Sequence, residues 1–269
     1  MARILLALLP GTAMAILKEN LKLVERMDYT PQPILLNIES RIEHDIRIRS
    51  CAKEPETVQW IEESFKSGDV FYDIGANVGV YSLVAAKANS GGVLVYAFEP
   101  AFINYSQLCQ NIYLNSLSDS IIPLPIALSS ETCIDSLNYQ NLIPGGALHA
   151  LGQATDYKDD FFEPIFQQKT LGYRLDDFVR LFDIKPPNHI KIDVDGIEAA
   201  ILMGAEDIFK GSSIRSILVE VEEGRPETTE VVEFLESRGL KFRSKHSPNF
   251  GIWPEPYTKA YNYIFDRKT

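Results

Sequence analysis

Short apolar runs alternate with amphipathic stretches along the chain from residue 69 onward. The runs at residues 70–75 and 93–100 are apolar almost throughout, which is typical of strands buried on both faces of a parallel sheet. The stretches between such runs repeat apolar residues at helical spacing. Strands that alternate with helices predict a mainly parallel sheet with helices on both faces, so we expect a three-layer, doubly wound α/β fold.

The predicted elements can be placed along the chain by residue number. The expected strands cover residues 70–75, 93–100, 120–128, 189–196, 214–223, 240–244 and 260–267. The expected helices cover residues 55–66, 77–90, 101–117, 175–184, 197–211 and 227–239. Pro55 in the first turn and Gly68 just past the end support the first of these helices. We therefore expect one domain over residues 53–269, preceded by an extension over residues 1–52.

The extension has a pattern of its own. Residues 1–30 show helical periodicity, and residues 34–50 alternate isoleucine with polar residues, which predicts a β-hairpin. Pro10 and Gly11 cut the first apolar run short of a secretory signal or a membrane span. We expect this apolar segment to pack on the domain or on a partner.

A long segment over residues 138–169 interrupts the alternation of strands and helices. It contains glycines, it is acidic in its middle, and it shows no clear period. Segments of this length inside a compact domain are usually lids, binding loops or disordered insertions. Its aromatic and apolar residues favour a lid or substrate-binding insertion over disorder.

The stretch FYDIGANVGVYS, residues 71–82, is a glycine turn between the first expected strand of the domain and the next helix. It lacks the Gly-Lys-Ser/Thr sequence of a phosphate-binding loop. It also lacks the pair of glycines, one residue apart, that a dinucleotide site uses to approach pyrophosphate. The ligand of this turn is therefore expected to be neither a nucleotide phosphate nor a dinucleotide.

Two acidic residues near this turn indicate which ligand it binds. Asp73 ends the first strand of the domain, where a carboxylate would repel pyrophosphate but suits the ammonium and sulfonium groups of S-adenosylmethionine (SAM). Gly75 would let the methionine part of SAM pass close to the backbone. Glu99 ends the next strand and suits the two ribose hydroxyls. With Gly79, these residues favour SAM.

The motifs DIGANVGVYS, FEP and KIDVDGIEAAILMGA make residues 53–221 resemble the FkbM-type methyltransferases, class I SAM-dependent enzymes known mostly as O-methyltransferases. The resemblance implies a Rossmann-like class I methyltransferase sheet whose last strand is antiparallel. It implies that the glycine turn lines the methionine end of SAM, that the acid after the second strand binds ribose, and that the residues after the third strand lie near adenine. The SAM-binding residues expected on this basis are Asp73, Gly75, Ala76, Asn77, Gly79, Glu99, Ala127 and Leu128.

The candidate catalytic groups lie on the fourth expected strand and in the expected lid. Strand alternation puts Lys191 and Asp193 on one side, with Asp193 at the carboxyl edge where doubly wound folds bind ligands. Asp193 could orient the methyl acceptor or act as a base, and Lys191 could tune its pKa; a purely structural ion pair is the alternative. His149 is a second candidate base, because imidazole titrates near neutral pH.

A metal is not favoured as part of this site. Asp193, Asp195 and Glu220 lie at strand ends and could hold a divalent cation. Three acids in such positions are permissive for magnesium without being diagnostic.

Composition narrows the function further. The chain has 26 basic and 37 acidic residues and a net charge of -11, which argues against nucleic-acid binding. Cys51, Cys109 and Cys133 lie far apart and are expected to be reduced thiols of a cytoplasmic protein.

The sequence as a whole predicts a SAM-dependent methyltransferase acting on a hydroxyl of a sugar, glycan or natural product. An NAD(P)-dependent oxidoreductase and a non-catalytic SAM-fold binding protein are the alternatives. The identity of the acceptor and a homo-oligomeric state are left open by the sequence.

Overall fold

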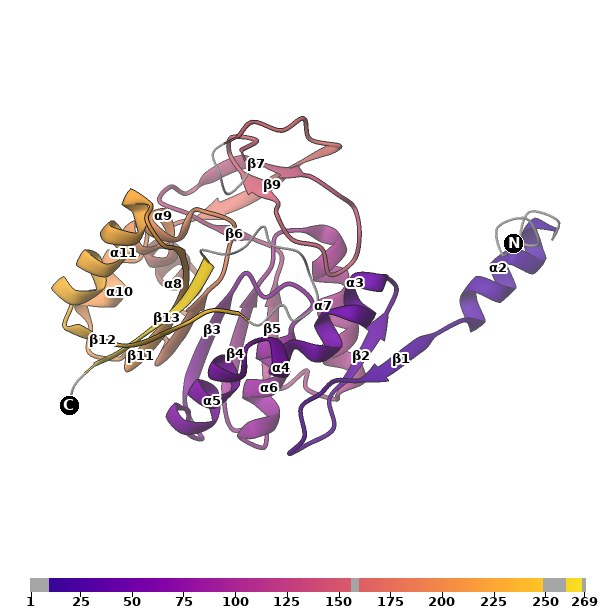
Figure 1. Ribbon diagram of the computed structural model, residues 1–269, viewed down its shortest axis with the longest axis horizontal. Helices are drawn as coiled ribbons and strands as arrows, with labels where there is room; N and C mark the ends of the chain where they lie inside the picture. Colours follow the sequence, from indigo (N-terminus) through magenta and orange to yellow (C-terminus); the bar gives the residue numbers. More distant parts are fainter. Residues whose placement is uncertain (1–9, 156–159, 249–259, 268–269) are drawn as a thin grey trace.

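A seven-stranded sheet forms the centre of the molecule (Figure 1). The computed structural model describes residues 10–155, 160–248 and 260–267. In spatial order the strands of the sheet are β12 (Leu240–His246), β13 (Ala260–Arg267), β11 (Ser216–Glu222), β10 (His189–Ile192), β3 (Val70–Ile74), β4 (Leu94–Phe98) and β5 (Ile121–Leu124). Neighbours are parallel except where β13 runs antiparallel to β11 and β12. The expected parallel sheet with an antiparallel last strand is confirmed.

Helices cover both faces of this sheet and complete three layers. One face is covered by α5 (Pro55–Ser64), α6 (Val80–Ala88) and α7 (Phe102–Leu114). The other face is covered by α8 (Leu175–Phe182), α9 (Glu198–Met203), α10 (Glu206–Lys210) and α11 (Pro226–Ser237). Phe71 and Tyr72 of β3 belong to different cores, one on each face, because successive strand residues point to opposite sides.

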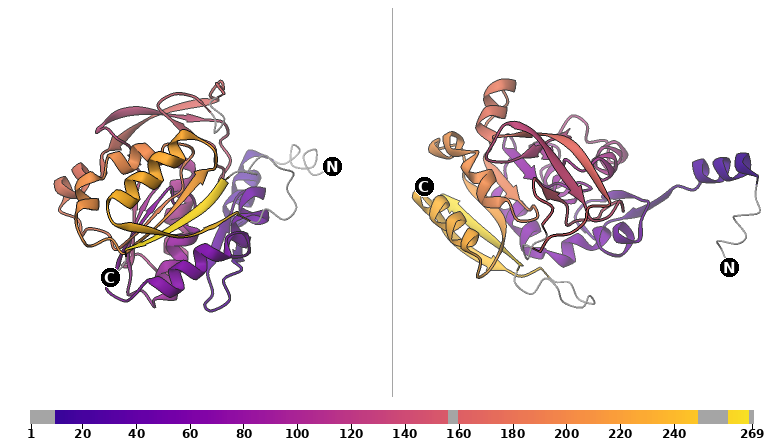
Figure 2. Two further views of the ribbon diagram at one scale, coloured as in Figure 1. Left: turned by 60° about the vertical axis from the view of Figure 1, so that its left-hand side comes forward. Right: turned by 90° about the horizontal axis from the view of Figure 1, so that it is seen from above.

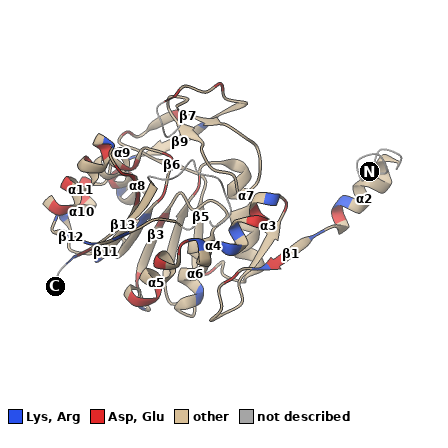
Figure 3. Ribbon diagram, viewed as in Figure 1, with Lys and Arg blue, Asp and Glu red and all other residues tan. Residues whose placement is uncertain are grey.

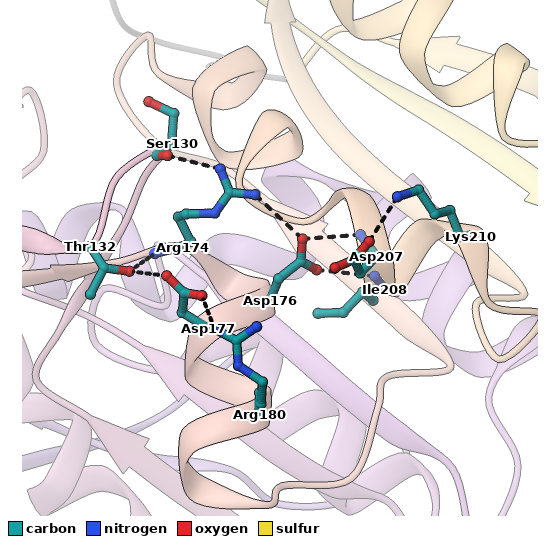
Figure 4. Close-up of polar contacts among 9 residues, drawn as sticks. All are labelled: Ser130, Thr132, Arg174, Asp176, Asp177, Arg180, Asp207, Ile208 and Lys210. Carbon is teal, nitrogen blue, oxygen red and sulfur yellow. Dashed lines mark hydrogen bonds and ion pairs between the residues drawn. The ribbon is translucent and has the colours of Figure 1, made fainter.

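The single helix expected over residues 197–211 is two short helices, α9 and α10. Figure 4 shows the side chains that fix the second one. The carboxylate of Asp176 accepts hydrogen bonds from the backbone N–H groups of Asp207 and Ile208, both at 3.0 Å, and so caps α10. Arg174 pairs with Asp176 at 3.6 Å and donates to the carbonyl of Ser130 at 3.2 Å. These contacts join segments distant in sequence, so helical periodicity alone does not reveal the break.

The N-terminal extension differs from its expected pattern. The helix expected over residues 1–30 is α2 (Gly11–Asn20), which projects away from the rest of the molecule in Figure 1; residues 1–9 lie outside the described ranges. The hairpin expected over residues 34–50 is displaced, because β2 (Leu35–Ile38) pairs with β1 (Leu23–Arg26), a strand inside the range expected to be helical.

The second half of the expected hairpin is helical. Residues 41–53 form α3 (Arg41–Asp45), the 3₁₀ turn η1 (Arg47–Arg49) and α4 (Ser50–Lys53). Ser40 and Glu43 make a capping box at the start of α3, which outweighs the strand propensity of the isoleucines.

A second, smaller sheet contains the two ends and a short inner part of the segment expected over residues 138–169 (Figure 2). Its strands, in spatial order, are β6 (Ala127–Leu128), β9 (Phe166–Tyr173), β7 (Cys133–Tyr139) and β8 (Ala150–Leu151). β7 and β9 pair antiparallel along their full length, so both ends of the expected insertion lie in strands. In Figure 1 the smaller sheet lies above the central sheet, and β6 follows β5 of the central sheet in the chain.

Candidate active site

A cavity of about 520 Å³ lies at the carboxyl ends of the central parallel strands, next to the small sheet. This volume is in the range of small-molecule sites. Its wall contains all of the predicted site residues except Asp73 and Gly79. They are Gly75, Ala76, Asn77, Glu99, Ala127, Leu128, His149, Lys191 and Asp193. The structure therefore brings together residues that are up to 118 positions apart in the sequence (Gly75 to Asp193).

Two glycines shape the turn between β3 and α6. Gly75 has a φ of 81°, and a side chain there would collide with the backbone carbonyl of Asp193. Gly79 has a φ of 89°, and a side chain there would meet Leu108 of α7. Gly75 is needed at the cavity wall, where the backbone is bare, whereas Gly79 serves helix packing behind the wall.

Glu99 presents its carboxylate at the cavity while both oxygens are held by the backbone. The N–H of Asn77 donates to Glu99 Oε2 at 2.7 Å, and the N–H of Ala101 donates to Oε1 at 2.8 Å. Burial raises the pKa of Glu99 to about 7, although these two donors oppose the rise. A carboxylate fixed in this way can still accept hydrogen bonds from a ligand's hydroxyl pair through its remaining lone pairs.

Asp73 lies behind the wall of the cavity. Its side chain is buried, and Oδ2 accepts a hydrogen bond from Ser82 Oγ at 2.6 Å. Oδ1 has no partner among the described residues. Burial raises the pKa of Asp73, although nearby Lys191 opposes the rise. Since β3 and β10 pair with Asp73 opposite Lys191, this acid faces the ion pair of β10.

The ion pair expected on the fourth strand is present. Lys191 Nζ lies 2.6 Å from Asp193 Oδ2 and 5.0 Å from the centre of the Tyr81 ring. Burial opposes the charge on Lys191, but the carboxylates of Asp193, Asp73 and Glu54 outweigh it and raise the pKa of Lys191. Burial also opposes the charge on Asp193, yet Lys191 holds its pKa below the usual range. Both groups are therefore charged at neutral pH, which makes Asp193 a good hydrogen-bond acceptor and a weak base.

His149 lines the cavity, and both of its imidazole nitrogens are buried. Neither ring nitrogen has a hydrogen-bond partner in the part of the chain that the structure describes. Its ring packs on Tyr139, with centroids 4.6 Å apart. Burial lowers the pKa of His149 to about 4, so the imidazole is neutral at pH 7. An unused nitrogen of this neutral imidazole can accept a proton, and its pKa of about 4 makes it, like Asp193, a weak base at pH 7.

The segment of residues 144–149, which we call the strap, lines the cavity and is held by several side chains distant in sequence. Arg47 donates twice to the Gly145 carbonyl, at 3.0 and 2.6 Å. Asn77 and Asn104 both donate to the Gly146 carbonyl, at 2.8 and 3.0 Å. The sequence does not indicate a role for Arg47 or Asn104, because their partner is backbone, which leaves no residue pattern.

The sequence predicts Asp195 only as one of three acids at strand ends that could hold a cation. In the structure it accepts hydrogen bonds from the backbone of the strap, at Leu148 and His149. The described residues contain no group of three or more His, Cys, Asp or Glu side chains that could hold a metal ion. Burial raises the pKa of Glu220 well above its usual value, which makes it a poor cation ligand.

Figure 3 shows both acidic and basic positions along the helices, with basic positions on α3 and α4. None of the helices in the described ranges is long and apolar enough to cross a bilayer.

The strand order, the glycine turn and the place of the cavity define the Rossmann-like fold of class I methyltransferases. The methyltransferase FkbM of Methylobacillus flagellatus KT shares this fold, with a TM-score of 0.50 and 15% identity over 74% of this chain. The match spans only 44% of that structure's chain. TYW2 of P. horikoshii, in complex with MeSAdo, matches with a TM-score of 0.50 and 13% identity over 91% of this chain and 70% of its own.

Sequence comparison gives the family. The model of the methyltransferase FkbM domain matches residues 73–242, so this chain belongs to the FkbM methyltransferase family. It is similar to the hexuronic acid methyltransferase AglP of Haloferax volcanii, with 27% identity over 68% of each chain. It is also similar to the 31-O-demethyl-FK506 methyltransferase FkbM of Streptomyces tacrolimicus, with 27% identity over 69% of this chain and 77% of that one.

Proposed function

We propose that this protein transfers a methyl group from SAM to a hydroxyl of a sugar, glycan or natural product. The observation that carries the proposal is one cavity lined by Glu99, by the Lys191–Asp193 pair and by His149. The names of the relatives, a hexuronic acid methyltransferase and a 31-O-demethyl-FK506 methyltransferase, support a hydroxylated acceptor.

The donor set of the cavity fits SAM. Glu99 would accept the two ribose hydroxyls, Ala127 and Leu128 would lie against adenine, and the backbone from Gly75 to Asn77 would border the methionine part. The negative charge of Asp193 suits the cationic cofactor. Bound SAM would supply an electrophilic methyl group and leave as S-adenosylhomocysteine. We assign Asp73 to the support of Lys191 rather than to direct contact with SAM, because it is not part of the cavity wall.

The residues of this chain would orient the acceptor and take its proton. Asp193, kept ionised by Lys191 at 2.6 Å, would accept a hydrogen bond from the acceptor hydroxyl and aim its oxygen. A ring nitrogen of His149 would take the hydroxyl proton as the oxygen bonds to the methyl carbon. The strap would keep water from the reacting atoms.

Two alternatives differ from this proposal in what they predict. Family membership counts against an NAD(P)-dependent oxidoreductase. A non-catalytic binding protein would bind SAM without turnover.

A cytoplasmic location belongs to the same proposal, because all three cysteines are free thiols.

The test combines SAM binding with methyl transfer. We expect calorimetry to show binding of SAM and none of NADP, and methyl-labelled SAM to transfer its label to a panel of sugars, uronates, glycans and polyketides, with NMR identifying an O-methyl product. His149→Asn should lower kcat by about 100-fold or more and leave the Kd for SAM unchanged. SAM binding without transfer to any acceptor would support the binding protein, and a labelled N-methyl product would refute O-methylation.

A further inference from the structure

Asp195 connects the strap to the carboxyl end of β10. Its Oδ2 accepts hydrogen bonds from the backbone N–H of Leu148 at 2.7 Å and of His149 at 3.1 Å. Asp195 lies two residues after Asp193, so a single strand end carries both the acid of the ion pair and the contact that holds the strap.

The backbone at this contact is one that needs external support. Leu148 has a φ of 67°, in the left-handed region that non-glycine residues rarely adopt. Such conformations persist only when surrounding contacts hold them. Since the N–H of Leu148 makes the shorter of the two bonds to Asp195, this carboxylate is the contact that acts directly on the strained residue.

Few contacts other than those of its backbone fix the position of the His149 imidazole. Both of its ring nitrogens lack hydrogen-bond partners within the described ranges, so no polar contact orients the ring. The ring is placed by its packing on Tyr139, at 4.6 Å between centroids, and by the path of its own backbone. That path is set on one side by the bonds to Asp195 and, three residues earlier, by the bonds of Asn77 and Asn104 to the Gly146 carbonyl.

We infer that Asp195 is a positioning residue that holds the strap so that the His149 ring faces the acceptor hydroxyl. This inference rests on the proposed role of His149 as the base. Asp195 itself takes no proton from the acceptor. It acts through backbone N–H groups, so an acceptor oxygen, and not a negative charge, is what the position requires.

Substitutions at Asp195 and His149 test this in a double-mutant cycle. We expect Asp195→Ala to lower kcat about 10- to 100-fold, while Asp195→Asn, whose amide oxygen can accept the same N–H groups, restores most of it. In a His149→Ala background, Asp195→Ala should cost no more than about a further threefold, because its effect passes through the missing ring. Full multiplication of the two losses, or an Asn variant as slow as the Ala variant, would overturn the inference.

Amide hydrogen exchange tests the strap without any turnover. Asp195→Ala should speed exchange at Leu148 and His149 at least about tenfold, whereas Asp207→Asn, an equal loss of charge on the exposed face of α10, should leave it unchanged. Unchanged exchange in Asp195→Ala would refute the role of Asp195. If the wild-type protein methylates no acceptor, the proposed function fails, and exchange still decides whether Asp195 holds the strap.

Discussion

Replacement of Glu99 by glutamine tests two things: how much the burial of this acid destabilises the folded protein, and how much its carboxylate contributes to SAM binding. In the folded protein burial raises the pKa of Glu99 from 4.5 to about 7. A difference of one in pKa corresponds to about 1.4 kcal/mol, so the folded state prefers the neutral carboxyl by about 3 kcal/mol. The amide of the Glu99→Gln variant is neutral at every pH and removes this dependence.

The sign of the effect follows from proton binding. Between pH 4.5 and 7 the folded state keeps the proton of Glu99 while the unfolded state has lost it, so the free energy of unfolding falls as pH rises through this window. From about pH 5 to about pH 8 wild type should lose about 2 to 3 kcal/mol relative to Glu99→Gln. Asp195 and Glu198 also have raised pKa values, but they are present in both proteins and cancel in the comparison.

Urea unfolding of both proteins at about pH 5 and about pH 8 measures this difference directly. Calorimetry on the samples at about pH 8, where Glu99 is ionised, should show SAM bound about 10- to 100-fold more weakly by the variant, because one charge-assisted contact to ribose is worth about 1.5–3 kcal/mol. A pH-independent difference in unfolding free energy would refute the buried titration of Glu99. An unchanged Kd for SAM would refute its assignment to ribose.

Two further predictions concern the residues behind and beside the cavity wall. Asp73→Asn keeps a hydrogen-bond partner for Ser82 and should change the Kd for SAM by less than about fivefold. Gly75→Ala brings a side chain against the Asp193 carbonyl and should raise the Kd for SAM at least about tenfold. Calorimetry measures both Kd values, and equal losses of affinity would mean that Asp73 contacts the cofactor. Lys191→Met leaves the Asp193 and Asp73 carboxylates without their cation and should lower the free energy of unfolding by about 3–5 kcal/mol in urea, while a loss below about 1 kcal/mol would contradict the burial of the pair.

The central sheet could be predicted because its signal is local. Each parallel strand is buried on both faces and so appears as a continuous apolar run, which a single sequence displays. The errors fall where distant contacts decide. Residues 41–50 alternate like a strand, but the capping box of Ser40 and Glu43 starts a helix there. The strands β7 and β9 carry polar and exposed positions, and their pairing across about 30 residues has no local signature.

The place of Gly75 and Glu99 at the cavity could be predicted for the same reason that the sheet could. Gly75 and Glu99 follow recognisable strands, and parallel strands end at a common edge. Asp73 shows the limit of this reasoning. Its position in the sequence identifies the strand end but not which way the side chain points, and the structure turns it towards Ser82 and Lys191.

The contacts that hold the strap could not be predicted from the sequence. Asp195 bonds to residues 46 and 47 positions away, and Arg47 to a carbonyl 98 positions away. In each case the partner is a backbone group, which nearly every residue type supplies, so the residue type at the partner position does not indicate the contact. Side chains that hold a segment by its backbone are therefore hidden from single-sequence reasoning, even where, as with Asp195, they lie within a recognisable motif. They are also the residues whose replacement can alter catalysis while every group in contact with SAM or acceptor stays in place.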